Sequence, residues 1–364
     1  WQVLKPAAET TTFMEFVAEG FKTVKPRKGL VVGIDASLWF FQVQNPFLSG
    51  HWNAGHSPEL RTVFHRLAFL STLPLTPLFV FDGPQRPAIK RGTRTLGPEH
   101  WMAPVFRNFI SAFGFDSHVA PGEAEAELAM LNRVGIIDAV FTEDVDTLIF
   151  GAHTHASNPC SALAHAHQQA STSNKRDHME ISIYRSARIL EHPDVRLSTG
   201  GLVMMALLCG GDYDQGLVGC GPSVAHPLST SDLADNLHQA ALAPDVTAHQ
   251  LVDALIDWRE DLQHQLRDNP QHLLPRRYPA LSQLIPFSFP LPSILRLYIA
   301  PLTSSSPLPP GSPLLSLGQQ HLDITTLAAL CETHFCWGLT EGVANALRSS
   351  VWPAAVSRTM QDSI

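Results

Sequence analysis

Residues 119–148 read VAPGEAEAELAMLNRVGIIDAVFTEDVDTL, and they are the most informative part of the sequence. It carries two acidic pairs, Glu123 with Glu125 and Asp144 with Asp146. Between the pairs, apolar residues recur at helical spacing up to Gly135, and a short apolar run rich in branched residues follows at Ile136–Phe141. This pattern predicts a helix followed by a buried parallel strand. Because ligands bind beyond the carboxyl ends of parallel strands, we expect chemistry at the second acidic pair.

Two earlier segments repeat the arrangement of a strand followed by an acid. Gly29–Ile34 (GLVVGI) is a buried-strand candidate that leads into Asp35, and Pro77–Phe81 (PLFVF) is another that leads into Asp82. An amphipathic helix is predicted between them at Pro58–Leu73. Alternating strands and helices predict an α/β fold with a doubly wound, mostly parallel sheet.

The second half of the chain predicts further helices and two irregular segments. The helices are expected at three places: residues 200–209, 251–266 and 324–348. Residues 286–313 are rich in proline and serine, which favours an extended wrap rather than a helix. Residues 151–178 have little periodicity and predict a mobile surface loop. We therefore divide the chain into a core, a helical region and a C-terminal extension: residues 1–215, 216–285 and 286–364.

The predicted loop at 151–178 contains the histidines His153, His155, His165 and His167. Imidazole nitrogens are common ligands of soft metals, so a metal site there is one interpretation. The alternative is a solvated low-complexity insert. We favour the insert, because alanine, serine and histidine dominate the segment without any helical or strand period.

Composition limits the kinds of protein that this chain can be. With 45% apolar and 16% charged residues, the 364-residue chain can bury a substantial core. Its five cysteines are odd in number and widely spaced, which argues against a secreted disulfide scaffold and for a reducing compartment. The sequence shows no apolar run long enough to span a bilayer and no signal peptide, so we expect no membrane partner.

The net charge of −8 is unfavourable for a protein that meets nucleic acid, but most of it belongs to seven carboxylates: Asp35, Asp82, Glu123, Glu125, Asp144, Asp146 and Asp212. If the sheet brings them together, their repulsion requires a compensating cation. Mg²⁺ and Mn²⁺ prefer carboxylate oxygens, and two such ions roughly 4 Å apart suit hydrolysis of a phosphodiester. The alternative is that each acid separately caps a helix or stabilises a turn.

Two further features suit a ligand that carries phosphate. A basic stretch contains Lys90, Arg91 and Arg94, and clustered cations often contact phosphates, although a solvated helix face is the alternative. Gly216–Gly221 (GLVGCG) follows Asp212, and glycine-rich turns expose backbone N–H groups that can hold a phosphate. Such turns are also common as plain connectors.

Together these motifs resemble the XPG-type and flap endonuclease superfamily of structure-specific 5′ nucleases. The similar segments are VVGIDASLWFF and FVFDG near the N-terminus, APGEAEAELA and FTEDVDTLIFG in the middle, and LLCGGDYDQGLVGCGP further on. The resemblance implies a PIN-like nuclease core with a helix-two-turn-helix region and a helical C-terminal extension. It also implies that residues precede Trp1, because members of this family begin with Met-Gly.

The resemblance assigns roles to the candidate residues. The seven acids are implied as ligands of two Mg²⁺ ions, with Mn²⁺ as a substitute. Lys90 and Arg91 are implied to polarise the scissile phosphate, and Arg94 to contact DNA. Gly219 and Gly221 fall in the implied phosphate-binding turn, where similar proteins also bind K⁺.

Within the superfamily, the chain is most similar to the eukaryotic Holliday junction resolvases. The segment between Asp82 and Glu123 is short, and the segments DWREDLQHQL and DITTLAALCETHFCWG resemble the resolvases' C-terminal extension. This implies cleavage of branched double-stranded DNA such as four-way junctions and flaps, a dimer formed on the junction, and a nuclear location. The alternatives are a monomeric 5′ flap endonuclease and a catalytically degenerate DNA-binding module. A PIN-type ribonuclease fits less well, because such enzymes lack the glycine-rich turn.

Overall fold

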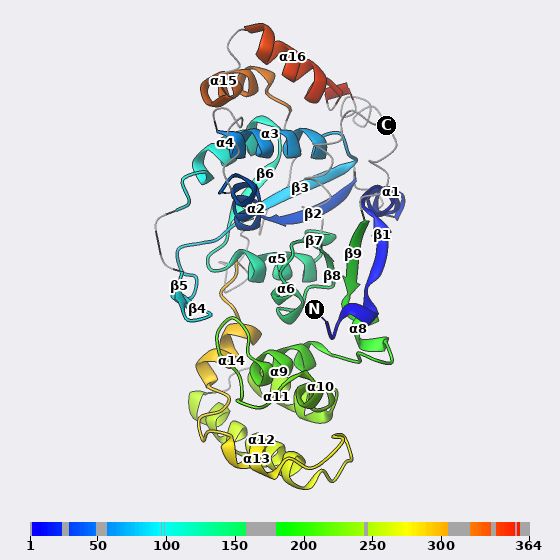
Figure 1. Ribbon diagram of the computed structural model, residues 1–364, viewed down its shortest axis with the longest axis vertical. Helices are drawn as coiled ribbons and strands as arrows, with labels where there is room; N and C mark the ends of the chain where they lie inside the picture. Colours follow the sequence, from blue (N-terminus) through cyan, green and yellow to red (C-terminus); the bar gives the residue numbers. More distant parts are fainter. Residues whose placement is uncertain are drawn as a thin grey trace.

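The computed structural model describes residues 2–23, 29–48, 57–95, 97, 99–157, 180–243, 247–304, 321–335, 340–353 and 355–356. A seven-stranded sheet crosses the middle of the molecule (Figure 1). Its strands, in spatial order, are β1 (Glu9–Thr12), β9 (Glu180–Arg185), β8 (Thr154–Ser157), β7 (Ala139–Phe141), β2 (Leu30–Asp35), β3 (Leu75–Phe81) and β6 (Asp116–Val119). The strands from β8 to β6 are parallel, whereas β9 runs antiparallel to both of its neighbours. The predicted mostly parallel α/β sheet is therefore confirmed.

The sheet separates two hydrophobic cores, because successive side chains of a strand point to opposite faces. On β2, Val31 belongs to one core, whereas Val32 and Ile34 belong to the other. One face is covered by α1 (Phe13–Thr23), α2 (Ala36–Leu48), α3 (Pro58–Leu70), α4 (Ala103–Ala112), α15 (Ile324–Phe335) and α16 (Thr340–Ser350). Helices on both faces make the sheet doubly wound, as the alternating pattern predicts.

The core on the other face extends from the sheet into the helices of the middle and lower parts of the molecule in Figure 1. They are α5 (Ala124–Arg133), α6 (Asp146–Ile149), α8 (Ser186–Glu191), α9 (Thr199–Cys209), α10 (Pro222–Ser229), α11 (Asp232–Leu242), α12 (Ala248–Asp268), α13 (Pro279–Leu284) and α14 (Pro292–Ile299). The two short strands β4 (Ile89–Lys90) and β5 (Thr93–Arg94) form a separate hairpin. In the described residues, no helix has both the length and the hydropathy needed to cross a membrane.

The prediction of an extended segment at 286–313 is wrong in part, because α14 lies inside it. Proline at the first position of a helix needs no N–H donor, and Pro292 occupies such a position. Leu295 and Tyr298 are buried on the inner face of this helix. A proline-rich composition therefore concealed a helix that tertiary packing stabilises.

The prediction of a mobile loop at 151–178 is also wrong in part. Residues 154–157 form β8, which pairs with β7 on one side and β9 on the other. His155 is fully buried, and its Nδ1 lies 2.8 Å from the hydroxyl of Thr147. Neither His153 nor His155 belongs to a metal-binding group of the described residues, while His165 and His167 lie outside those residues.

The buried His155 makes the stability of the protein depend on pH. Burial lowers its pKa from 6.5 to about 3, so the unfolded chain takes up the proton first. The stability contributed by the neutral ring is complete above pH 6.5 and is lost as the pH falls towards 3. At pH 5 the loss is about 2 kcal/mol relative to pH 7.

We expect His155→Gln to remove about 2 kcal/mol of the difference in unfolding free energy between pH 7 and pH 5. Urea unfolding at both values measures this difference. The exposed His249, changed in the same way, serves as the control. An unchanged pH dependence in His155→Gln would contradict the assignment.

Candidate metal centre

The structure places the seven predicted carboxylates at strand ends and helix beginnings. Asp35 is the last residue of β2, Asp82 follows β3, and Asp146 begins α6 directly after Asp144 and Val145. Glu123 caps the N-terminus of α5, and Glu125 lies in the first turn of that helix. Asp212 follows the C-terminus of α9. These ends all meet at the carboxyl edge of the parallel strands, as the motif spacing predicts.

Three of the acids form a compact group. Glu125, Asp146 and Asp212 each offer one carboxylate oxygen, and these oxygens lie within 4.8 Å of one another. Hydrogen bonds from backbone N–H and hydroxyl groups hold the neighbouring acids in place. Asp82 accepts hydrogen bonds from the N–H of Ala124, at 2.9 Å, and from the hydroxyl of Ser37, at 3.1 Å.

Burial and repulsion between neighbouring carboxylates raise several pKa values in and around this group. Burial raises the pKa of Asp35 to about 7, with contributions from the charges of Asp82 and Asp144. Burial and the charges of Asp144 and Asp212 raise the pKa of Asp146 to about 8. Burial also raises the pKa of Glu125 well above its ordinary value. The cluster is therefore strained by its own negative charge.

The ammonium group of Lys90 lies inside the cluster. Its Nζ is 2.5 Å from Glu123 Oε1, 3.1 Å from Glu125 Oε2 and 3.0 Å from Asp212 Oδ2. Burial alone would lower the pKa of Lys90, but the three carboxylates raise it above its ordinary value. Lys90 thus supplies a positive charge that partly balances the acids.

Arg91 makes a second contact with the cluster. Its Nε is 2.5 Å from Asp212 Oδ1, and its backbone N–H donates to the carbonyl oxygen of Asp212 at 2.7 Å. Burial raises the pKa of Asp212, yet the charges of Lys90 and Arg91 outweigh that effect and lower it. The Arg91 side chain is 70% exposed, so it remains accessible to a ligand.

The hairpin of β4 and β5 carries both positively charged side chains, Lys90 and Arg91, to the cluster. Its turn consists of Arg91 and Gly92, whose φ angles are 49° and 72°. A two-residue turn of this hand matches the twist of the strands, and glycine adopts it without steric cost. Arg94 is exposed on β5. The basic stretch is therefore a hairpin, which corrects the alternative interpretation as a helix face.

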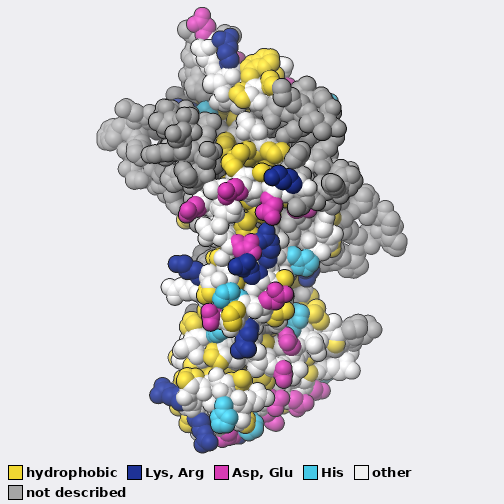
Figure 2. Space-filling view, turned by 90° about the vertical axis from the view of Figure 1, so that its right-hand side faces the viewer, with side chains coloured by type: hydrophobic (Ala, Val, Ile, Leu, Met, Phe, Trp, Pro, Cys, Tyr) yellow, Lys and Arg dark blue, Asp and Glu magenta, His cyan; other side chains and the backbone are white. Residues whose placement is uncertain are grey.

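The donor set fits divalent cations. Asp146 Oδ2 is buried and has no hydrogen-bond partner among the described residues. Carboxylate oxygens are the ligands that Mg²⁺ and Mn²⁺ prefer, and a buried, unpartnered oxygen is costly unless it binds a cation. On the face shown in Figure 2, acidic and basic side chains gather side by side in the middle of the molecule.

Comparison with known proteins agrees with this geometry. Residues 12–96 match the XPG N-terminal domain and residues 114–212 match the XPG I-region, and together the matches cover about half of the chain. The chain belongs to the XPG family. The two matched regions contain all seven acids, including Asp212 at the end of the second match.

Two XPG-family relatives illustrate the similarity. A probable flap endonuclease 1 homolog of Danio rerio is 31% identical over 219 residues, which are 56% of this chain and 56% of the relative. Flap endonuclease GEN homolog 1 of Homo sapiens is 26% identical over 246 residues, which are 62% of this chain and 24% of the relative. The chain therefore spans about half of the first relative's length and about a quarter of the second's.

Solved structures confirm the fold over nearly the whole chain. The Holliday junction-resolving enzyme GEN1, solved in complex with product DNA and a Mg²⁺ ion, has a TM-score of 0.72 at 28% identity. The similarity covers 97% of this chain and 77% of that one. Structures of GEN-1 with cesium, sodium or potassium are also similar, with TM-scores of 0.75, 0.72 and 0.72.

The glycine-rich turn of the XPG-family chain lies between α9 and α10. Gly219 has a φ angle of 86° and an exposed position, and Gly221 caps α10. Their predicted contacts with phosphate and K⁺ remain predictions. The helix after the turn forms even though Pro227 lies inside it.

Two residues that sequence reasoning missed also belong to the site. The N–H of Ser37 donates to Asp35 Oδ1 at 2.8 Å, and its hydroxyl donates to Asp82. The hydroxyl of Tyr213 donates to Glu123 Oε2, and its ring centroid lies 5.9 Å from Lys90 Nζ. The one available signal was their closeness in sequence, since Ser37 lies two positions after Asp35 and Tyr213 directly follows Asp212, but closeness in sequence does not reveal a contact.

Proposed function

We propose that this protein is a metal-dependent, structure-specific DNA endonuclease that cuts one strand near a branch point. The observation that carries the proposal is the compact group of Glu125, Asp146 and Asp212, in which one Asp146 oxygen is buried and has no hydrogen-bond partner among the described residues. Five segments that are distant in sequence supply this cluster and its neighbours. A divalent cation bound there would offset the repulsion between the carboxylates that this convergence creates.

The seven carboxylates would hold two Mg²⁺ ions, with Mn²⁺ as a substitute. When bound, such a pair supplies an activated water and stabilises negative charge on the leaving oxygen, giving a 5′-phosphate and a 3′-hydroxyl. Tyr213 holds Glu123, and Ser37 holds Asp35 and Asp82, so the chain fixes the ligands before substrate arrives. Because these carboxylates are already held in place, less conformational entropy is lost when the metal ions and the substrate bind.

Lys90 and Arg91 have a second role in this proposal. In the structure their charges are directed at Asp212 and its neighbours. With divalent cations held by those carboxylates, Lys90 and Arg91 would be free to contact the scissile phosphate. Preorganised positive charge next to a developing oxyanion accelerates such reactions.

The substrate that we propose is branched double-stranded DNA, with a preference for four-way junctions. The similarity to the Holliday junction-resolving enzyme GEN1 over 97% of the chain supports this preference. Gly219, Gly221 and Arg94 would contact the DNA backbone, with K⁺ at the glycine-rich turn, and selection would follow DNA shape. Two coordinated cuts would require a dimer assembled on the junction. We also propose that residues 1–215 form the nuclease core, followed by a helical region at 216–285 and a C-terminal extension at 286–364. The proposed location of the protein is the nucleus.

A monomeric 5′ flap endonuclease is the second candidate. The 31% identity with the probable flap endonuclease 1 homolog of Danio rerio favours it. A catalytically degenerate DNA-binding module is less consistent, because the complete acid set is present and at least three of its members converge.

Cleavage of matched substrates separates these functions. We expect the chain with Mg²⁺ to cut a four-way junction and a 5′ flap, but not linear duplex, and to cut the junction at least about tenfold faster than the flap. Denaturing gels with end-labelled strands measure the rates. Faster cutting of the flap would favour the second candidate, and no cutting of any branched DNA would favour the degenerate module.

A further inference from the structure

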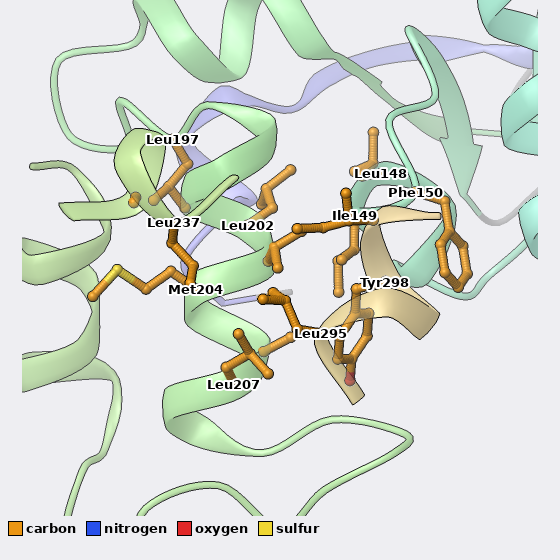
Figure 3. Packing of buried hydrophobic residues seen from close by; sticks show 14 of the residues in the cluster. Leu148, Ile149, Phe150, Leu197, Leu202, Met204, Leu207, Leu237, Leu295 and Tyr298 are labelled. Atoms are coloured by element: carbon orange, nitrogen blue, oxygen red, sulfur yellow. The ribbon is translucent and has the colours of Figure 1, made fainter. Parts of the chain in front are cut away.

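Helix α14 reaches the acid cluster from a part of the chain that neither XPG match includes. Its residue Tyr298 is 2% exposed, and Figure 3 shows it projecting from α14 beside Leu295. The ring of Tyr298 packs against that of Tyr213 with a centroid distance of 4.8 Å, and against Phe150 at 6.4 Å. Since Tyr213 directly follows Asp212, α14 supports the segment that carries a candidate metal ligand.

The Tyr298 hydroxyl also lies against this segment. A Cβ atom added at Gly211 would come 2.2 Å from the hydroxyl oxygen, which is far inside van der Waals contact. The hydroxyl is buried against the backbone of this segment. Burial and the charge of Asp146 raise the pKa of Tyr298, while the backbone N–H groups of Tyr213 and Asp212 act in the opposite direction. Tyr298 therefore packs directly against the loop that holds Asp212.

Tyr213 extends this support to the other side of the cluster. Its hydroxyl donates to Glu123, and its ring faces the ammonium group of Lys90. The two tyrosine rings, tilted by 56° to each other, thus connect α14 to residues of three other segments. Pairs of aromatic rings at such distances attract each other beyond the effect of their buried area, which favours one position of the loop.

We propose that Tyr298 is a positioning residue of the metal centre, which holds the Gly211–Tyr213 segment so that Asp212 stays in register with Asp146. The absence of a side chain at residue 211 is part of this arrangement, because any side chain there would separate the loop from Tyr298. The inference rests on the proposed function in one respect, namely that Asp212 and Asp146 are metal ligands.

The first test measures Mn²⁺ affinity of the DNA-free full chain by isothermal titration calorimetry. We expect Tyr298→Leu, which loses the ring contact with Tyr213, to weaken Mn²⁺ binding about tenfold. Tyr298→Phe keeps the ring and is expected to stay within about threefold of the unchanged chain. Equal Mn²⁺ affinities for the Leu variant and the unchanged chain would overturn the proposal.

The second test uses Gly211→Ala, alone and combined with Tyr298→Phe. Without the hydroxyl, the nearest ring atom would lie 3.4 Å from the new Cβ, which is ordinary contact. We therefore expect Gly211→Ala alone to weaken Mn²⁺ binding about tenfold, and the double variant to recover most of the loss. An equal loss in both backgrounds would contradict the contact.

Two control variants separate positioning from general instability. Gly200→Ala places its Cβ 2.8 Å from the carbonyl oxygen of Ala234, away from the acids, so it should lower the melting temperature without changing Mn²⁺ affinity. Tyr184→Phe removes a hydroxyl from a buried residue of β9 and should leave Mn²⁺ affinity unchanged, whatever it does to the melting temperature. If the unchanged chain binds no Mn²⁺, the proposed function fails. The contact is then judged from melting temperatures, where Tyr298→Phe must relieve the loss caused by Gly211→Ala.

Discussion

Asp35→Asn is expected to reduce the cleavage rate at least about 10³-fold and, at the same time, to stabilise the metal-free protein. The rate falls because a neutral amide oxygen binds Mg²⁺ much less strongly than a carboxylate. The folded protein still forms, because the amide oxygen can accept the N–H of Ser37 as Asp35 Oδ1 does. DNA binding measured without metal should therefore change little.

The gain in stability follows from the raised pKa of Asp35. Burial and the charge of Asp82 raise it from 3.8 to about 7, so between these values the folded state binds a proton that the unfolded state has released. The stability is complete below pH 3.8 and is lost as the pH rises through 7. Above pH 7 the cost is about 4 kcal/mol, which is an upper bound because the acids titrate together.

Urea unfolding in EDTA at pH 5 and pH 8 measures this effect. Asp35→Asn should unfold at a higher urea concentration than the unchanged chain at pH 8 and show a smaller difference between the two pH values. Asp253→Asn, on the exposed face of α12, is the matched control and should alter neither stability nor cleavage. A destabilised Asp35→Asn protein at pH 8 would contradict the electrostatic account.

Lys90→Met is expected to have opposite effects on metal binding and on catalysis. Methionine keeps much of the aliphatic length, but it removes the charge that lies within 3.1 Å of Glu123, Glu125 and Asp212. Because that charge no longer competes with a divalent ion, Mn²⁺ affinity of the DNA-free protein should rise roughly tenfold. The cleavage rate should fall about 10²-fold, since the phosphate loses a cationic contact.

Calorimetry with Mn²⁺ and single-turnover cleavage measure the two quantities for Lys90→Met. Lys5→Met, at an exposed position near the N-terminus, is the control for loss of a positive charge. Weaker Mn²⁺ binding by Lys90→Met would mean that Lys90 supports the metal site instead of competing for it. An unchanged cleavage rate would remove Lys90 from the proposed mechanism.

The sequence predicted the central sheet and the candidate acids because both depend on local patterns. A branched apolar run followed by an acid, as at Gly29–Asp35, determines a strand and the end at which its acid lies. Parallel pairing then brings such ends together without further information. The acidic pairs that contain Glu125 and Asp146 could be predicted as site residues from the local sequence alone, without knowledge of tertiary contacts.

The parts that the sequence did not predict depend on contacts between distant segments. Strand β1 has the sequence ETTT, which lacks an apolar alternation and forms because it pairs with β9. Tyr298 is 85 positions from its partner Tyr213, and no local pattern connects them. The place of Lys90 among the acids likewise follows from the hairpin turn, not from its charge.

Anomalous diffraction at the manganese edge tests the central claim most directly. Crystals of the DNA-free protein grown with Mn²⁺ should show two peaks roughly 4 Å apart, coordinated by oxygens from the set Asp35, Asp82, Glu123, Glu125, Asp144, Asp146 and Asp212. Glu125, Asp146 and Asp212 should contact the same ion, because their oxygens lie within 4.8 Å of one another. Manganese bound elsewhere, with Lys90 still paired to all three of its carboxylates, would contradict the account.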